Sequence, residues 1–209
     1  MSKLFLATIF IFIVGNMAKA GEIKIYGDSV FAKSGAIAEE FQRISNHSVI
    51  SHAVNGAVMS DIRDQYHGNK HENITTVIMD GGGNDVLQRS ALDCLTINSR
   101  CIEAVDNALG VMEQTLEEMA EDGLRTVVWV GYYRPIFLAR GLRGAIDYAV
   151  PFMKDVCEKA SIECIMIDPR EVFKDRWLVT YDGIHPTRKG SRLLAEMIWE
   201  TFKDHGIEP

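Results

Sequence analysis

The sequence predicts an α/β protein, a three-layer sandwich built on a five-stranded, parallel, flavodoxin-like sheet. Short apolar runs of strand length alternate along the chain with longer segments that carry a helical apolar period. The runs are apolar almost throughout, which indicates strands that helices cover on both faces. Because strand–helix–strand connections are almost always right-handed, such units wind into one sheet with helices on each side.

The first half of the chain supplies three of the expected strands and two helices. Residues 22–26 (EIKIY), 48–54 (SVISHAV) and 74–79 (ITTVIM) are predicted as strands, each followed by a glycine-containing turn. Residues 36–44 have apolar side chains at helical spacing, and residues 57–66 are expected to form the next helix. The order of these elements predicts two successive parallel crossovers.

The second half continues the alternation. Residues 102–119 carry a long amphipathic period, and residues 145–159 and 191–202 are two further expected helices. Residues 126–130 (TVVWV) and 162–167 (IECIMI) are the fourth and fifth strands. No repeat or linker divides the chain, so we expect a single domain.

The first twenty residues have the layout of a secretory signal peptide. Lys3 makes the start positive, residues 4–15 are an apolar run, and Ala18-Lys19-Ala20 is an A-x-A cleavage site. The run is shorter than the roughly 20 residues that span a bilayer, which favours cleavage over the alternative, an uncleaved anchor. We therefore expect residues 1–20 to be removed and residues 21–209 to be a secreted or periplasmic domain.

The expected mature chain is acidic. The sequence has 22 Lys and Arg residues against 29 Asp and Glu, and two of the lysines lie in residues 1–20, which leaves a formal net charge of −9 for residues 21–209. Nucleic acids and anionic membrane surfaces attract clustered Lys and Arg, so neither is expected as a partner. Stable membrane insertion is not expected after signal cleavage.

Four cysteines lie in the expected mature chain, at Cys94, Cys101, Cys157 and Cys164. Export exposes them to an oxidising compartment, where four cysteines allow three pairings. The two short spacings favour Cys94–Cys101 and Cys157–Cys164, each worth about 2.5 kcal/mol in the chain-entropy model. One bridge beside two buried free thiols stays open as the alternative, and zinc is disfavoured because there is no C-x-x-C pair.

Groups that acyl transfer needs follow the first three predicted strands. In open parallel sheets, ligands bind beyond the carboxyl ends of the strands. Ser29 follows the first strand and precedes a helix, so its hydroxyl is presented at a turn and its N–H can face a developing oxyanion. Gly56 offers an unobstructed backbone N–H after the second strand, and Asn84 offers a side-chain amide after the third. We predict an oxyanion hole made by Ser29, Gly56 and Asn84.

Asp182 and His185 complete a predicted catalytic triad. Their three-residue spacing in a turn lets the carboxylate accept the Nδ1 proton of the imidazole and stabilise the imidazolium. The other ring nitrogen then faces the serine. Singly, each of these residues has a common structural role, Ser29 as a helix cap and His185 as a satisfied turn residue. Their combination favours catalysis, whereas Asp28 is expected to brace its loop and Asp85 to cap the following segment.

These residues resemble the four sequence blocks of the SGNH hydrolase family, also called GDSL esterases and lipases. The matching blocks, in order, are Gly27-Asp28-Ser29, Asn55-Gly56, Gly82-Gly83-Asn84-Asp85 and Asp182-Gly183-Ile184-His185-Pro186. The resemblance spans residues 27–186 and implies a serine hydrolase that cleaves carboxylic esters or thioesters through an acyl-enzyme. It implies no metal or organic cofactor. The first block continues as Val30-Phe31, where many members have Leu-Ser, which loosens any subfamily assignment.

Two alternatives to hydrolysis stay open. The same residues could transfer an acyl group to a carbohydrate hydroxyl, and the same fold could be a binding module that has lost turnover. The expected substrate is a small-molecule, lipid or acetylated carbohydrate ester.

Two further segments could serve binding or structure. Tyr132, Tyr133 and Arg134 follow the fourth strand and could line a substrate pocket or pack as a core loop, and Trp177 has the same two interpretations. His67 and His71 have a spacing that a metal could use, but the Gly68-Asn69 between them favours a loop, and no third ligand is evident.

Overall fold

The structure, a computed structural model, describes residues 22–33, 36–70, 74–89 and 91–208. The predicted signal peptide lies outside these residues. Five strands pair in parallel in one sheet: β1 (Glu22–Tyr26), β2 (Ser48–Ser51), β3 (Thr76–Met79), β4 (Thr126–Val130) and β5 (Glu163–Ile167). Their spatial order is β2-β1-β3-β4-β5, the flavodoxin-like order, so the predicted fold class is confirmed.

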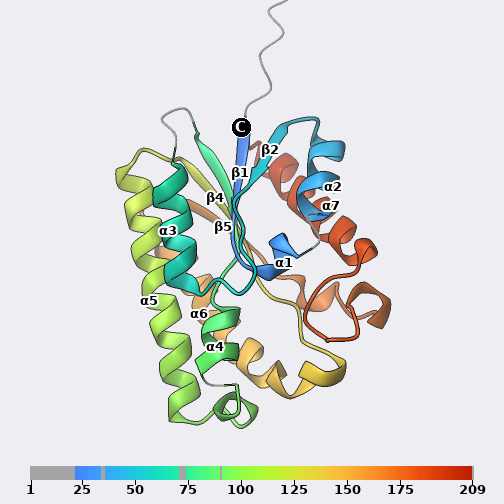
Figure 1. The fold of residues 1–209 in the computed structure, drawn as a ribbon. Helices are drawn as coiled ribbons and strands as arrows, with labels where there is room; N and C mark the ends of the chain where they lie inside the picture. The colour runs from blue at the N-terminus through green and yellow to red at the C-terminus, as the bar shows by residue number, and fades with distance from the viewer. Residues whose placement is uncertain (1–21, 34–35, 71–73, 90, 209) are drawn as a thin grey trace, which may run out of the picture.

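Helices cover both faces of the sheet (Figure 1). The α-helices are α1 (Ser29–Ala32), α2 (Ala36–Ser45), α3 (Met59–Asn69), α4 (Gly83–Arg89), α5 (Ser99–Glu121), α6 (Arg143–Lys159) and α7 (Arg188–Asp204). Short 3₁₀ helices are η1 (Asp93–Leu95), η2 (Phe137–Leu142), η3 (Pro169–Glu171) and η4 (Arg176–Leu178). Helices α2 and α7 lie on one face, while α3, α5 and α6 lie on the other.

The burial of each strand follows from its position in the sheet. Every residue of the central strands β3 and β4 is buried, because both faces are covered and both edges are paired. Strands β2 and β5 form the edges and are more exposed. One apolar core lies between the sheet and α3, α5 and α6, and a second lies between the sheet and α2 and α7.

Several element boundaries differ from the sequence prediction, among them those of β2 and α3. Strand β2 ends at Ser51 and not at Val54, although the N–H groups of His52 and Val54 still donate to carbonyls of Ile25 and Gly27. Helix α3 begins at Met59 because the Asp61 carboxylate accepts the N–H of Val58, 3.1 Å away, and fixes the entry to the helix. Helix α4 was not anticipated.

Both local disulfides favoured from the sequence are present. Cys94–Cys101 ties η1 to the start of α5, and Cys157–Cys164 ties α6 to β5. Among the described residues, no helix combines the length and the apolar composition needed to cross a bilayer.

Candidate active site

The turn after β1 holds Ser29 in place through buried polar contacts. The Asp28 carboxylate caps α1 by accepting the N–H of Val30 at 2.8 Å, and the N–H of Asp28 donates to Asp80 Oδ1 at 2.8 Å. Gly27 has no side chain to obstruct this contact, since a Cβ there would lie 1.9 Å from Asp80 Oδ1. Ser29 is consequently presented half-buried at the first turn of α1.

The turn that carries Asp182 and His185 is equally constrained. Asp182 Oδ1 accepts three hydrogen bonds, from the Thr180 hydroxyl at 2.6 Å and from the N–H groups of Ile184 and His185 at 2.9 and 3.0 Å. Gly183 adopts φ +79°, and a Cβ on it would lie 1.7 Å from the carbonyl oxygen of Ile136. Glycine is therefore required between the two polar residues.

Ser29, His185 and Asp182 form one line of hydrogen bonds. His185 Nε2 lies 2.9 Å from Ser29 Oγ, and Nδ1 lies 2.7 Å from Asp182 Oδ2. A carboxylate can only accept, so the Asp182 contact assigns the proton to Nδ1 and leaves the Nε2 lone pair facing the serine hydroxyl. The structure thus brings the three predicted triad residues together in the order that proton transfer from Ser29 requires.

The contacts of the Asp182 carboxyl lower its pKa and so favour its ionised form. Burial alone would raise its pKa, but the hydrogen bonds from Thr180, His185 and Ile184 outweigh burial and hold the pKa well below its usual value. Asp182 therefore stays ionised and can stabilise a charged imidazole.

Lys33 adds a contact that the sequence did not suggest. Its Nζ lies 2.9 Å from both Asp182 Oδ2 and His185 Nδ1. An ammonium has no lone pair, so beside an Nδ1–H it bonds only to the carboxylate. The side chain is half-exposed, which limits the strength of this ion pair.

The predicted oxyanion donors differ in whether they already donate hydrogen bonds to other groups. The N–H groups of Ser29 and Gly56 donate to no acceptor among the described residues. The Asn84 amide already donates to the Ala57 carbonyl at 3.0 Å and to Asp28 Oδ2 at 3.3 Å. The second of these bonds is long, so Asn84 would reach an oxyanion by giving up that contact.

Two buried carboxyl groups, those of Asp28 and Asp80, lie next to Ser29 in the turn after β1. Burial and the neighbouring Asp28 charge raise the pKa of Asp80 well above its usual value, and burial also raises that of Asp28. Tyr132 donates its hydroxyl to Asp28 Oδ2 at 2.7 Å and accepts the N–H of Gly83 at 3.1 Å. Burial and the proximity of the two carboxyls therefore favour the protonated form of Asp80 more than water does.

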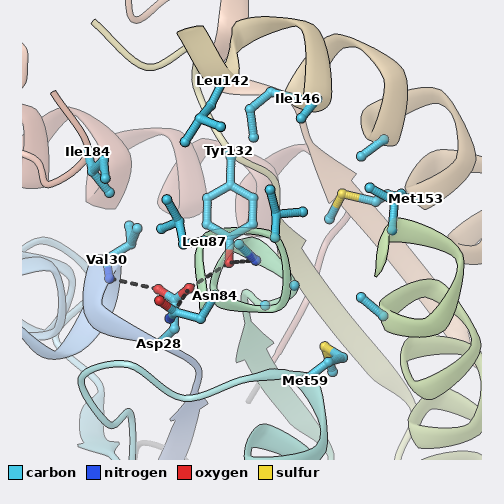
Figure 2. Close-up of a pocket in the computed structure, with 18 of the residues that line it drawn as sticks. Asp28, Val30, Met59, Asn84, Leu87, Tyr132, Leu142, Ile146, Met153 and Ile184 are labelled. Atoms are coloured by element: carbon cyan, nitrogen blue, oxygen red, sulfur yellow. Dashed lines mark hydrogen bonds between the residues drawn. The ribbon is translucent and has the colours of Figure 1, made fainter. Parts of the chain in front are cut away.

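A pocket opens beside Ser29 (Figure 2), with an empty volume of about 910 Å³ including the space at its mouth. The polar groups of Asp28, Asn84 and Tyr132 gather at one end, and Ser29, which directly follows Asp28, also lines the pocket. Helices α4, α5 and α6 supply most of the remaining wall, which is largely apolar. An apolar wall with a few polar groups at one end is typical of a small-molecule site.

Only two residues of the predicted substrate-binding segment line this pocket. Tyr132 stands in it, and Tyr133 lines it while stacking on Phe173 at 4.3 Å between ring centroids. Arg134 is directed away, to Asp147 and Glu171, so the geometry gives no support for a substrate contact. Trp177 is largely exposed and lies outside the pocket lining.

The histidine pair considered as a metal site is only partly described. His67 contacts Glu118 at 2.9 Å, and His71 lies outside the described residues. In the described part of the chain, no three side chains of His, Cys, Asp or Glu are grouped as a metal site requires.

Comparisons with known proteins give a match at the level of structure. No protein-family model and no curated protein matches the sequence. Among solved structures, the lipase Lip_vut3 from a goat rumen metagenome aligns with a TM-score of 0.69 at 19% identity, over 86% of this chain and 96% of that one. A catalytic mutant of Axe2, an acetylxylan esterase from Geobacillus stearothermophilus, aligns with a TM-score of 0.67 at 15% identity, over 90% and 96%.

A third solved structure carries a family name. It is a protein from Desulfitobacterium hafniense ascribed to the lipolytic G-D-S-L family, with a TM-score of 0.66 at 12% identity, over 86% of this chain and 98% of that one. At such identities the likeness establishes a common fold over nearly the whole described domain. It leaves the chemistry to be argued from the residues at the site.

Proposed function

We propose that this protein, whose fold is that of the SGNH (GDSL) hydrolases, is a serine hydrolase that cleaves carboxylic esters or thioesters through an acyl-enzyme. One observation carries the proposal. Ser29 Oγ, His185 and Asp182 are linked by contacts of 2.9 and 2.7 Å beside a pocket that can hold a substrate.

The reaction follows from this geometry. His185 Nε2 accepts the Ser29 hydroxyl proton as the oxygen attacks the ester carbonyl, and Asp182 stabilises the imidazolium that forms. The free N–H groups of Ser29 and Gly56, with the Asn84 amide, stabilise the oxyanion. The imidazolium then protonates the leaving alcohol or thiol, and water activated by His185 hydrolyses the acyl-serine.

We also propose that the protein acts after export, in the secreted or periplasmic space. The A-x-A site at residues 18–20 predicts export, and the two disulfides support an oxidising environment. The lipase and the acetylxylan esterase that share the fold suggest lipid and acetylated carbohydrate esters as the substrates to examine.

The test combines covalent labelling with turnover. The purified protein is treated with a fluorophosphonate probe and is assayed separately with p-nitrophenyl esters. Ser29→Ala should abolish labelling and lower kcat by about 10⁶-fold, as expected for loss of a triad nucleophile. Ser60→Ala, which alters an exposed serine on α3, is the matched control and should label and turn over like the wild type.

Peptide mapping identifies the labelled residue. A phosphonate adduct on a residue other than Ser29, or ester hydrolysis that survives Ser29→Ala, contradicts the proposal.

A further inference from the structure

The pocket beside Ser29 is sharply divided between a polar end and an apolar end. In Figure 2 the Tyr132 hydroxyl points toward Asp28 and Asn84, while Leu142, Ile146 and Met153 surround the opposite part of the pocket. Apart from Asp28, none of the described residues that line it has a charged side chain. A ligand in this pocket would meet hydrogen-bonding groups near the nucleophile and only aliphatic or thioether surface beyond them.

We propose that the pocket binds the acyl chain of the substrate, and that the enzyme prefers esters of unbranched aliphatic acids longer than butanoate to acetyl esters. This inference rests on the proposed function and specifies which part of the ester is recognised.

Small residues on two facing helices create the space. Helix α5 and helix α6 each present a stripe at helical spacing, and those stripes include Ala108, Ala145 and Ala149 among larger apolar residues. Alanine at these positions leaves a gap that leucine or methionine would fill. The pocket is therefore a consequence of side-chain size between α5 and α6, and its depth can be altered by a single substitution.

The apolar wall excludes a sugar ring as the occupant. Each buried hydroxyl of a carbohydrate needs a hydrogen-bond partner, and an unpaired one costs free energy. The Asp28 carboxylate is already engaged by Val30, Tyr132 and Asn84, so it is not available to such a hydroxyl. An aliphatic chain makes no such demand and gains from leaving water.

Tyr132 limits the path that the acyl chain of the substrate can take through the pocket. Its hydroxyl is hydrogen-bonded to both Asp28 Oδ2 and the Gly83 N–H, so the ring is held in one orientation in the pocket. Figure 2 shows Ile184 on one side of this ring and Met153 on the other. An acyl group attached to Ser29 would pass along the ring toward Met153, which suits a slender unbranched chain.

The experiment is a chain-length series with p-nitrophenyl acetate, butanoate, octanoate and palmitate. Each buried methylene is worth about fourfold, so kcat/KM should rise about 10²-fold from butanoate to octanoate. Ala149→Leu, which fills the pocket from α6, should lower the octanoate-to-acetate ratio at least about tenfold, the loss of two methylene sites. Ala160→Leu, a partly buried alanine at the end of α6 outside the pocket, is the control and should keep the wild-type ratio.

The inference would be overturned if kcat/KM stayed constant or fell with chain length, or if Ala149→Leu kept the wild-type octanoate-to-acetate ratio. Neither result would contradict ester hydrolysis itself. Binding to the Ser29→Ala protein separates the two proposals, because it needs no turnover. Calorimetry with butanoate and octanoate should show tighter binding of octanoate, by about 10²-fold if the whole chain is buried. Equal or undetectable binding of both acids overturns the inference, whether or not the wild-type protein hydrolyses esters.

Discussion

The substitution Asp182→Asn tests the triad most directly, because the surrounding contacts dictate how the new side chain must lie. Oδ1 of Asp182 accepts three hydrogen bonds, from Thr180 and from two backbone N–H groups. In the variant only the amide oxygen can accept these, so the amide NH₂ must occupy the position of Oδ2, 2.7 Å from His185 Nδ1.

We expect a loss of activity because this arrangement moves the ring proton of His185 to the wrong nitrogen. An NH₂ group donates, so Nδ1 becomes an acceptor, and the ring proton moves to Nε2, where it faces Ser29 Oγ. The imidazole then cannot accept the serine proton. A triad held in this wrong tautomer loses about 10⁴-fold in kcat, equivalent to about 5.4 kcal/mol of transition-state stabilisation.

The assay is kcat on p-nitrophenyl butanoate, with the ¹⁵N shifts of His185 reporting the tautomer and circular dichroism reporting the fold. Lys33→Met is the control. It removes the other contact to Asp182 Oδ2, a half-exposed ion pair, and should change kcat by no more than about fivefold. Asp182→Asn with activity within tenfold of wild type would refute the reasoning, as would an inactive variant that keeps its proton on Nδ1.

Two further predictions concern stability. Because the folded pKa of Asp80 is raised, the folded state keeps a proton that the unfolded chain loses above the ordinary carboxyl pKa, so the free energy of unfolding falls as pH rises. Asp80→Asn should remove that dependence, so in urea unfolding the stability of the variant relative to the wild type should increase from about pH 5 to about pH 8; parallel pH profiles would contradict this. Replacing Cys94 and Cys101 together by Ala should cost about 2.5 kcal/mol and lower Tm by about 5–10 °C in calorimetry, and an unchanged Tm would show that the bridge does not restrain the unfolded chain.

The fold was readable from the sequence because its signals are local. Apolar runs such as residues 126–130 predict a buried strand from composition alone. The right-handed rule for strand–helix–strand connections then predicts how the strands join into one sheet. The strand ends also indicated where Ser29, Asn84 and His185 would meet, since the carboxyl ends of parallel strands share one edge of the sheet. Boundaries were harder to predict, as at Val54, whose N–H still donates to the carbonyl of Gly27 after β2 has ended.

The parts of the site that the sequence did not reveal depend on contacts between distant segments. Nothing near Asp80 signals that its carboxyl accepts the N–H of Asp28, fifty-two residues earlier. The apolar stripe containing Ala108 and Ala149 is visible in the sequence, but ordinary helix packing would have the same pattern. Whether such a stripe closes tightly or leaves a pocket depends on how α5 and α6 cross, which only coordinates show. The partners of Arg134 were not predictable for the same reason, since its carboxylate partners lie on α6 and η3.

Ser29, the proposed nucleophile, and His185, its proposed base, are far apart in the sequence, and helix α7 packs on α2 to bring the two regions together. A ribosome has released the segment carrying residue 29 long before it has synthesised residue 185. Nascent or truncated products therefore contain the serine without the imidazole that activates it. The proposed activity would therefore require a chain that has been synthesised at least as far as His185 and has folded to bring that residue to Ser29.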